Sequence, residues 1–223
     1  DPKEDDLIEP KWLTKKFGVL NEIDKELKRR DTYQGFQKSI FNKTHQIIDH
    51  QVKKNDLVID ATIGNGYDSL YLLDIITEGT LFGFDIQEVA INNTNKLLHQ
   101  HQKTNYKLFN IGHEHLLETL HHYQHKISLI IFNLGYLPNG NKNIRTKPNT
   151  TIKAIDQGYQ LLNKKGMILI TVYPDESNKN TTGKEEEQVL LKHLQEHYAH
   201  QYTIYHNTDN PKAPYLIQLK IEN

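Results

Sequence analysis

The stretch VIDATIGNG, residues 58–66, decides the fold of this chain. It is an apolar run that ends in the acid Asp60 and then breaks into a turn with glycines at Gly64 and Gly66. A second apolar run, LFGFD, ends at Asp85, about 20 residues beyond the glycines. Glycine backbone can approach a ligand closely, and a carboxylate at a strand end can accept the hydroxyls of a ribose. The two runs therefore predict a nucleotide-type cofactor lying across the edge of a parallel sheet.

Predicted strands and helices alternate on both sides of this stretch. Hydrophobic periodicity predicts helices at 36–52, 67–77, 89–101, 114–123, 150–162 and 185–197. Strands are expected at 57–61, 80–84, 106–109, 127–132 and 167–172, followed by an antiparallel pair at 202–205 and 215–221. Strands that alternate with helices need crossover connections. We therefore expect an α/β, Rossmann-like fold, with a seven-stranded, mostly parallel sheet, helices on both faces and a C-terminal antiparallel hairpin.

The composition narrows the classes of protein to which this chain can belong. Its 223 residues fit one domain of ordinary size, and its net charge of -1 argues against coating nucleic acid by a bulk positive field. The absence of cysteine excludes disulfides, thiolate metal sites and a cysteine nucleophile. No run approaches the roughly 18 apolar residues of a membrane span, and no signal-peptide pattern is present. We expect a cytoplasmic protein with no membrane partner.

Residues 1–35 differ from the rest of the chain, and we expect them to form an N-terminal helical extension to a domain of residues 36–223. Large apolar side chains recur at helical spacing from Trp12 to Leu27, among many lysines and arginines. Packing of this helix on the domain is favoured, because its apolar groups need burial. A basic arm that touches RNA or a second subunit is the alternative, and the sequence leaves a homodimer open.

The polar residues after the first three strands each allow two interpretations. Asp60 either reaches the amino-acid end of the cofactor or orders the glycine turn, and Asp85 either holds a ribose or caps the next helix. Asn110 follows the third strand, where it is placed to contact an adenine edge or to form a turn. His113, shortly after it, is a candidate for lining the same pocket. The third glycine of a dinucleotide-binding fingerprint would fall at Ser69, so an NAD domain is the poorer match.

A fourth element, Asn133-Leu134-Gly135-Tyr136, ends another apolar strand at the same edge of the predicted sheet. It resembles the (Asn/Asp)-Pro-Pro-(Tyr/Phe) motif of class I methyltransferases that act on amino nitrogens. The amide oxygen of Asn133 and the following carbonyl can accept N–H bonds from an amine and hold its lone pair toward a methyl donor. Tyr136 can stack on a base or face a cationic centre. An ordinary turn after the strand is the alternative.

Four longer strings extend this resemblance to a particular family. VIDATIGNGYDSLYL, LFGFDIQEVAINNT, IIFNLGYLPNGNKNIRTKPNTTIKAI and TGKEEE are similar to those of the MnmM (YtqB) family, over about residue 55 to the C-terminus. Members use S-adenosylmethionine to methylate the amine of 5-aminomethyl-2-thiouridine at the wobble position of tRNA. The resemblance implies the class I methyltransferase fold, S-adenosylmethionine as cofactor and the tRNA anticodon stem-loop as partner.

The resemblance also implies roles for individual residues. Cofactor contacts are expected from Asp60, Thr62, Gly64, Asn65, Gly66, Asp68, Asp85, Gln87, Asn110, His113 and Asn133. Asn133 and Tyr136 are the expected catalytic residues. Contacts to the substrate are expected from Gly135, Tyr136, Arg145, Lys147, Thr150 and Thr151. The stretch 174–182 and the first 35 residues depart from the family pattern, so no role is carried over to them.

Other functions compete with this interpretation. Methylation of an rRNA amino group, a protein amide or a small-molecule amine would use the same cofactor site. A non-catalytic RNA-binding module that keeps the fold is a further alternative. Thirteen histidines are present, but their surroundings look solvated and no converging ligand set can be defined, so no metal site is expected. His113 and Tyr136 are the candidates for a general base.

Overall fold

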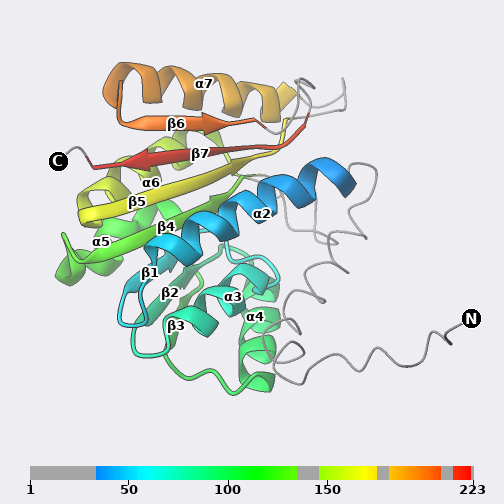
Figure 1. Ribbon diagram of the computed structural model, residues 1–223, viewed down its shortest axis with the longest axis vertical. Helices are drawn as coiled ribbons and strands as arrows, with labels where there is room; N and C mark the ends of the chain where they lie inside the picture. Colours follow the sequence, from blue (N-terminus) through cyan, green and yellow to red (C-terminus); the bar gives the residue numbers. More distant parts are fainter. Residues whose placement is uncertain (1–33, 135–145, 175–180, 207–212, 222–223) are drawn as a thin grey trace, which may run out of the picture.

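The computed structural model describes residues 34–134, 146–174, 181–206 and 213–221 (Figure 1). Its centre is a seven-stranded sheet with the strand order β3-β2-β1-β4-β5-β7-β6. The strands β1 to β5 run parallel, whereas β7 is antiparallel to both β5 and β6. The expected fold class is therefore confirmed. The strands are β1 (Leu57–Asp60), β2 (Thr80–Phe84), β3 (Tyr106–Phe109), β4 (Ile127–Asn133), β5 (Leu162–Val172), β6 (Tyr202–Tyr205) and β7 (Tyr215–Lys220).

Helices cover both faces of this sheet, because crossovers that keep one hand change faces where the strand order changes direction. One face packs against α2, α3 and α4, and α2 crosses in front of the sheet in Figure 1. The opposite face packs against α5, α6 and α7. The helices are α2 (Gln34–Gln51), α3 (Tyr67–Ile75), α4 (Glu88–Gln100), α5 (Leu116–Leu120), α6 (Pro148–Leu161) and α7 (Thr181–His197), with two 3₁₀ turns, η1 (His113–His115) and η2 (His121–Tyr123).

The residues of β4 alternate between the two apolar clusters. Leu129 and Ile131 belong to the cluster under α2 and α3, whereas Ile130 and Phe132 belong to the cluster under α5 and α6. All four are at most 5% exposed, because a central parallel strand is covered on both sides. The period of two then places the side chain of Asn133 on the same face as Ile131.

The strand order reverses direction between β1 and β4, since the chain passes from β3 at one edge back to the middle of the sheet. In open parallel sheets, ligands bind outside the carboxyl ends of the strands at such a switch point. The carboxyl end of β1 is Asp60, that of β4 is Asn133, and Asp85 directly follows β2. The topology alone thus brings the three polar strand ends to one edge.

Several element boundaries differ from the sequence-based predictions. The helix expected at 114–123 is broken into η1, α5 and η2. Strand β5 begins at Leu162 rather than at residue 167, because a register irregularity between β4 and β5 lets the segment after α6 pair early. Within it, the Oδ1 atom of Asn163 accepts the backbone N–H of Lys165 at 2.9 Å. The predicted extension covers residues 1–35, and residues 1–33 of it lie outside the described residues.

Candidate active site

The glycine turn after β1 is built on left-handed backbone. Gly64 has φ 56° and Gly66 has φ 83°, which is the region that side chains with a Cβ rarely adopt. A Cβ on Gly66 would lie 2.7 Å from the side chain of Thr94, which packs against the turn from α4. The hydroxyl of Thr94 also donates to the carbonyl of Gly64 at 3.2 Å. The turn therefore needs its glycines and presents its backbone, including the partly exposed Asn65, at the edge of the sheet.

The side chain of Asp60 holds this turn in place through hydrogen bonds to residues on both sides of the glycines. Its side chain is fully buried, and its carboxylate accepts the hydroxyl of Ser69 at 2.6 Å and the backbone N–H of Thr62 at 3.2 Å. Burial, with the nearby charge of Asp68 adding to it, raises the pKa of Asp60 to about 7. Of the two roles considered for Asp60, the geometry supports the ordering of the turn. Ser69 stands where a dinucleotide fingerprint would have glycine, and its hydroxyl serves this bond.

Asp85 joins the glycine turn to the next helix. One oxygen accepts the backbone N–H of Gly64 at 3.1 Å, and the other accepts the backbone N–H of Gln87 at 2.9 Å. The amide of Asn110 donates to the carbonyl of Asp85 at 3.0 Å. Burial raises the pKa of Asp85, while its backbone donors act in the opposite direction. The structure thus links Gly64, Gln87 and Asn110 through hydrogen bonds to Asp85. The contact of these residues with a cofactor stays a prediction.

Two apolar residues at this edge were missed in the sequence analysis. Ile86 is 57% exposed and Val89 is 52% exposed, and they are the exposed large hydrophobic residues of the described part of the chain. Ile86 follows Asp85 directly, and Val89 lies in the first turn of α4. The amide of Asn110 bonds to the carbonyl of Asp85, so this edge combines hydrogen-bonding groups with the apolar surface of Ile86. A purine ring needs both kinds of contact. The position of Ile86 just after the strand-end acid is the signal that could identify it.

His113 lies beneath the same edge but on the other face of the sheet. It is 9% exposed, its ring packs edge-on against Phe132 with centroids 5.7 Å apart, and its Nε2 atom has no hydrogen-bond partner among the described residues. Burial lowers the pKa of His113, so the ring is neutral near pH 7. Phe132 and Asn133 point to opposite faces, and this separates His113 from the amide of Asn133. His113 is therefore a poor candidate for a base that serves an amine held by Asn133.

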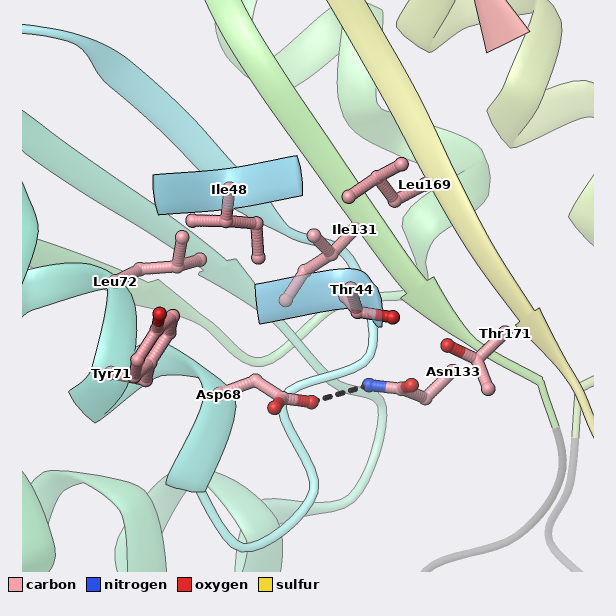
Figure 2. A pocket seen from close by; sticks show the side chains of 9 residues that line it. All are labelled: Thr44, Ile48, Asp68, Tyr71, Leu72, Ile131, Asn133, Leu169 and Thr171. Atoms are coloured by element: carbon pink, nitrogen blue, oxygen red, sulfur yellow. Dashed lines mark hydrogen bonds between the residues drawn. The ribbon is translucent and has the colours of Figure 1, made fainter. Parts of the chain in front are cut away.

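The end of β4 is fixed by two hydrogen bonds of Asn133. Its backbone N–H donates to the hydroxyl of Thr62 at 2.7 Å, which ties β4 to the glycine turn. Its side-chain Nδ2 donates to a carboxylate oxygen of Asp68 at 2.7 Å, as Figure 2 shows. A carboxylate can only accept, so the amide must turn its nitrogen toward Asp68 and its oxygen the other way. The predicted residues Gly135, Tyr136 and Arg145 lie outside the described residues.

A pocket opens beside the pair Asp68 and Asn133 (Figure 2). The empty space of this pocket is about 280 Å³ when the open solvent at its mouth is counted, so the pocket is a partly open hollow and not an enclosed cavity. Its apolar wall comes from Ile48, Leu72, Ile131 and Leu169, and its polar lining from Thr44, Asp68, Tyr71, Asn133 and Thr171. Helices α2 and α3 and strands β4 and β5 contribute these residues, so the pocket lies between the cofactor edge and the α2 face of the sheet.

The three substrate residues predicted on α6 have different surroundings. Lys147 is exposed just before the helix, and the hydroxyl of Thr150 donates to its carbonyl at 3.0 Å. Thr151, in contrast, is fully buried, and its hydroxyl donates to Glu186 at 2.6 Å. The predicted RNA contact of Thr151 does not fit this placement, because its side chain faces the interior. Glu186 also accepts the hydroxyl of Thr146 at 2.8 Å, and the string TGKEEE contained the signal for it.

The residues that the structure describes contain no group of three or more histidine, cysteine, aspartate or glutamate residues that could hold a metal ion. None of the described helices combines the length and the hydropathy needed to cross a bilayer.

A sheet with this strand order, a glycine turn after β1 and a carboxylate after β2 define the Rossmann-like class of S-adenosylmethionine-dependent methyltransferase folds. The family model described as "Putative rRNA methylase" matches residues 81–220. The chain therefore belongs to that family.

One curated relative and two solved structures show how this chain compares with known proteins. The chloroplastic tRNA (mnm(5)s(2)U34)-methyltransferase of Arabidopsis thaliana is 35% identical over 156 residues, which are 64% of this chain and 57% of that protein. This chain thus spans little more than half of that relative. A "putative rRNA-methylase" of Clostridium thermocellum is 32% identical, with a TM-score of 0.74 over 81% of this chain and 96% of its own. A "putative methyltransferase" of Streptococcus mutans, solved in complex with SAH, is 28% identical, with a TM-score of 0.69 over 81% and 96%.

Proposed function

We propose that this protein transfers a methyl group from S-adenosylmethionine to the amine of 5-aminomethyl-2-thiouridine at the wobble position of tRNA, forming 5-methylaminomethyl-2-thiouridine. The observation that carries this proposal is the orientation of Asn133, whose amide nitrogen is bound to Asp68 so that its oxygen is available to an amine. The name of the Arabidopsis relative supports the choice of substrate, and the SAH-bound structure from Streptococcus mutans supports the cofactor.

The edge around the glycine turn fits S-adenosylmethionine. The turn presents backbone at the partly exposed Gly64 and Asn65, and the carboxylate of Asp85 beside it is the proposed acceptor of the ribose hydroxyls. Ile86 offers an apolar surface for the adenine ring, with Asn110 beside it. Carboxylates around the turn also favour a cationic cofactor over an uncharged one. When bound, the cofactor supplies an electrophilic methyl group on a sulfonium sulfur.

Asn133 orients the amine rather than reacting with it. Its Oδ1 atom accepts an N–H bond of the substrate, so that the lone pair of the nitrogen points along a fixed direction. The hydrogen bond from its backbone N–H to Thr62 holds the end of β4 against the glycine turn. This bond therefore fixes the position of the Asn133 amide relative to the proposed cofactor site. Orientation of two reactants is itself a large part of a rate enhancement, since it replaces their freedom to tumble.

Contact with the tRNA is proposed at the same end of the sheet. Lys147 is exposed at the start of α6, which follows β4, so its charge is available to a phosphate of the anticodon stem-loop. Near-zero net charge means that such local contacts, rather than a bulk field, must hold the RNA.

The direct experiment is nucleoside mass analysis of tRNA that carries 5-aminomethyl-2-thiouridine, after incubation with the protein and S-adenosylmethionine. We expect the gain of one methyl group on that nucleoside. The Asn133→Ala variant should lose this activity and still bind the cofactor, whereas Asn55→Ala, an exposed asparagine at the opposite edge of the sheet, should behave as wild type. Unmodified nucleoside after complete incubation with the wild-type protein would refute the substrate.

An amino group of ribosomal RNA is the second candidate, because the matched family carries the description of an rRNA methylase. Both candidates use the same cofactor edge and the same acceptor, Asn133. A parallel incubation with rRNA separates them, since the methylated nucleoside is identified by its mass and retention.

A further inference from the structure

Asp68 is the charged residue of the pocket that adjoins Asn133. It sits in the first turn of α3, and its Oδ2 atom accepts the Nδ2–H of Asn133 at 2.7 Å. The family resemblance predicts a cofactor contact for Asp68, and that contact stays a prediction. In the structure its carboxylate faces Asn133, at the strand end where the amine is proposed to be held (Figure 2).

The surroundings of this carboxylate strengthen its field. Four of the residues that line the pocket are apolar. The negative charge of Asp68 also acts on the buried Asp60, where it helps to raise the pKa. A carboxylate beside an apolar wall attracts a cation more strongly than one in water, because the local dielectric constant is lower.

A primary alkyl amine carries a proton at pH 7, as lysine does. The substrate of the proposed reaction therefore arrives as a cation but must become neutral before its nitrogen can react. A pocket that selects such a group needs one element that attracts the cation and one that directs the neutral amine. Asp68 and the oxygen of Asn133 provide these two elements side by side.

We propose that Asp68 is a positioning and specificity-determining residue for the substrate amine, acting in two ways. It holds the amide of Asn133 with the oxygen toward the substrate, and its charge draws the protonated amine into the pocket. The inference rests on the proposed function, because it assumes that the substrate is an amine. This role predicts that loss of the Asp68 carboxylate leaves the affinity for S-adenosylmethionine unchanged. The cofactor role suggested by the sequence predicts weaker binding of S-adenosylmethionine instead.

Two substitutions separate the two actions. Asp68→Asn removes the charge but keeps an oxygen that can accept from Asn133, whereas Asp68→Ala removes both. Asp74→Asn, on the solvent side of the same helix where Asp74 pairs with Lys103, is the matched control. For each variant, kcat and KM for the aminomethyl tRNA are measured from about pH 7 to about pH 10.5, a range that spans the ordinary pKa of an alkyl amine. The affinity for S-adenosylmethionine is measured by calorimetry.

At pH 7, Asp68→Asn should raise KM for the tRNA by about 10-fold with little change in kcat. The difference from wild type should persist to pH 9 and shrink only as the pH approaches about 10.4, where an alkyl amine such as that of lysine loses its proton and no longer feels the charge. Asp68→Ala should in addition lower kcat by about 10-fold or more at every pH, because Asn133 is no longer held. The Asp74→Asn control and the cofactor affinity of all variants should match wild type.

The inference is overturned if the main effect of Asp68→Asn is weaker binding of S-adenosylmethionine, or if its KM defect is independent of pH. If the wild-type protein methylates no aminomethyl nucleoside, the proposed function itself fails. In that case nuclear magnetic resonance still tests whether Asp68 orients the side-chain amide of Asn133 through their hydrogen bond. The side-chain amide signal of Asn133 should move in Asp68→Ala and stay in Asp74→Asn, and an unmoved signal in Asp68→Ala refutes the hold.

Discussion

The hydroxyl of Thr62 accepts the backbone N–H of Asn133 at 2.7 Å, although 71 positions separate the two residues in the chain. This bond joins the glycine turn, where we propose that the cofactor binds, to the strand end where we propose that the substrate amine is held. Any change in it should therefore alter the alignment of the two reactants more than the binding of either.

Replacement of Thr62 by valine tests this alignment. Valine keeps the shape of the side chain but removes the acceptor, which leaves a partly buried N–H without its partner at a cost of about 1–3 kcal/mol. We expect kcat to fall by about 10-fold, with a nearly unchanged affinity for S-adenosylmethionine. Steady-state kinetics and calorimetry measure the two quantities. Thr62→Ser, which restores the hydroxyl, should recover most of the activity, and a silent Thr62→Val would contradict the role of the bond.

Asp85→Asn tests the cofactor edge. The carboxylate accepts two backbone N–H groups at once, from Gly64 and Gln87, and one amide oxygen cannot replace both oxygens. An amide also lacks the charge that strengthens bonds from ribose hydroxyls. We expect affinity for S-adenosylmethionine to fall about 10-fold or more in a calorimetric titration. The exposed Glu118→Gln is the control, and equal affinity of both variants would exclude a cofactor role for Asp85.

Asp60 should make the stability of the protein depend on pH. Its pKa in the folded state is about 7, above the 3.8 of an ordinary aspartate, so folding favours the protonated form. The stabilisation that comes from the raised pKa of Asp60 is fully present below about pH 4 and is lost as the pH rises from about 4 to 7. Asp60→Asn cannot ionise, so its free energy of unfolding relative to wild type should increase by up to about 4 kcal/mol between pH 4 and 8.

Urea unfolding of both proteins at several pH values measures this difference. The comparison between the two proteins cancels other titrating groups, such as the buried His45, whose pKa is lowered by burial to about 3. A constant difference across the whole pH range would show that Asp60 is already ionised in the folded state at pH 4.

Glu186 should matter for folding rather than for contact with a ligand. It is 3% exposed and accepts the hydroxyl of the fully buried Thr151. Glu186→Ala removes that acceptor and should lower the free energy of unfolding by about 1–3 kcal/mol. Glu186→Gln, which retains an amide oxygen, should cost less, and the exposed neighbour variant Glu185→Ala should be neutral. Thermal unfolding of Glu186→Ala, Glu186→Gln and Glu185→Ala measures their relative stabilities. Equal stabilities would argue against a structural role for the buried carboxylate of Glu186.

Some parts of the candidate site can be predicted from the sequence, and others cannot. The glycine turn and Asp85 were found from the sequence, because a strand, a turn and a helix in succession fix their backbone locally. The same local rules left the role of Asp60 open, since only the packing of Ser69 above it shows that its carboxylate is turned inward. Thr151 was assigned to the substrate because its neighbours in the chain match a family motif, but the contact with Glu186 draws it into the interior.

The order of elements, the α/β class and the edge that carries the candidate ligand site can be predicted from the sequence alone. These follow from periodicity and from the backbone demands of glycine, which act between near neighbours. In contrast, the contact between Asn133 and Asp68 and the position of His113 on the opposite face follow from how the strands and helices pack. Which face a side chain takes depends on the register of a strand within the sheet, and the partner it meets there, 65 positions away for Asn133, depends on how the strands are ordered.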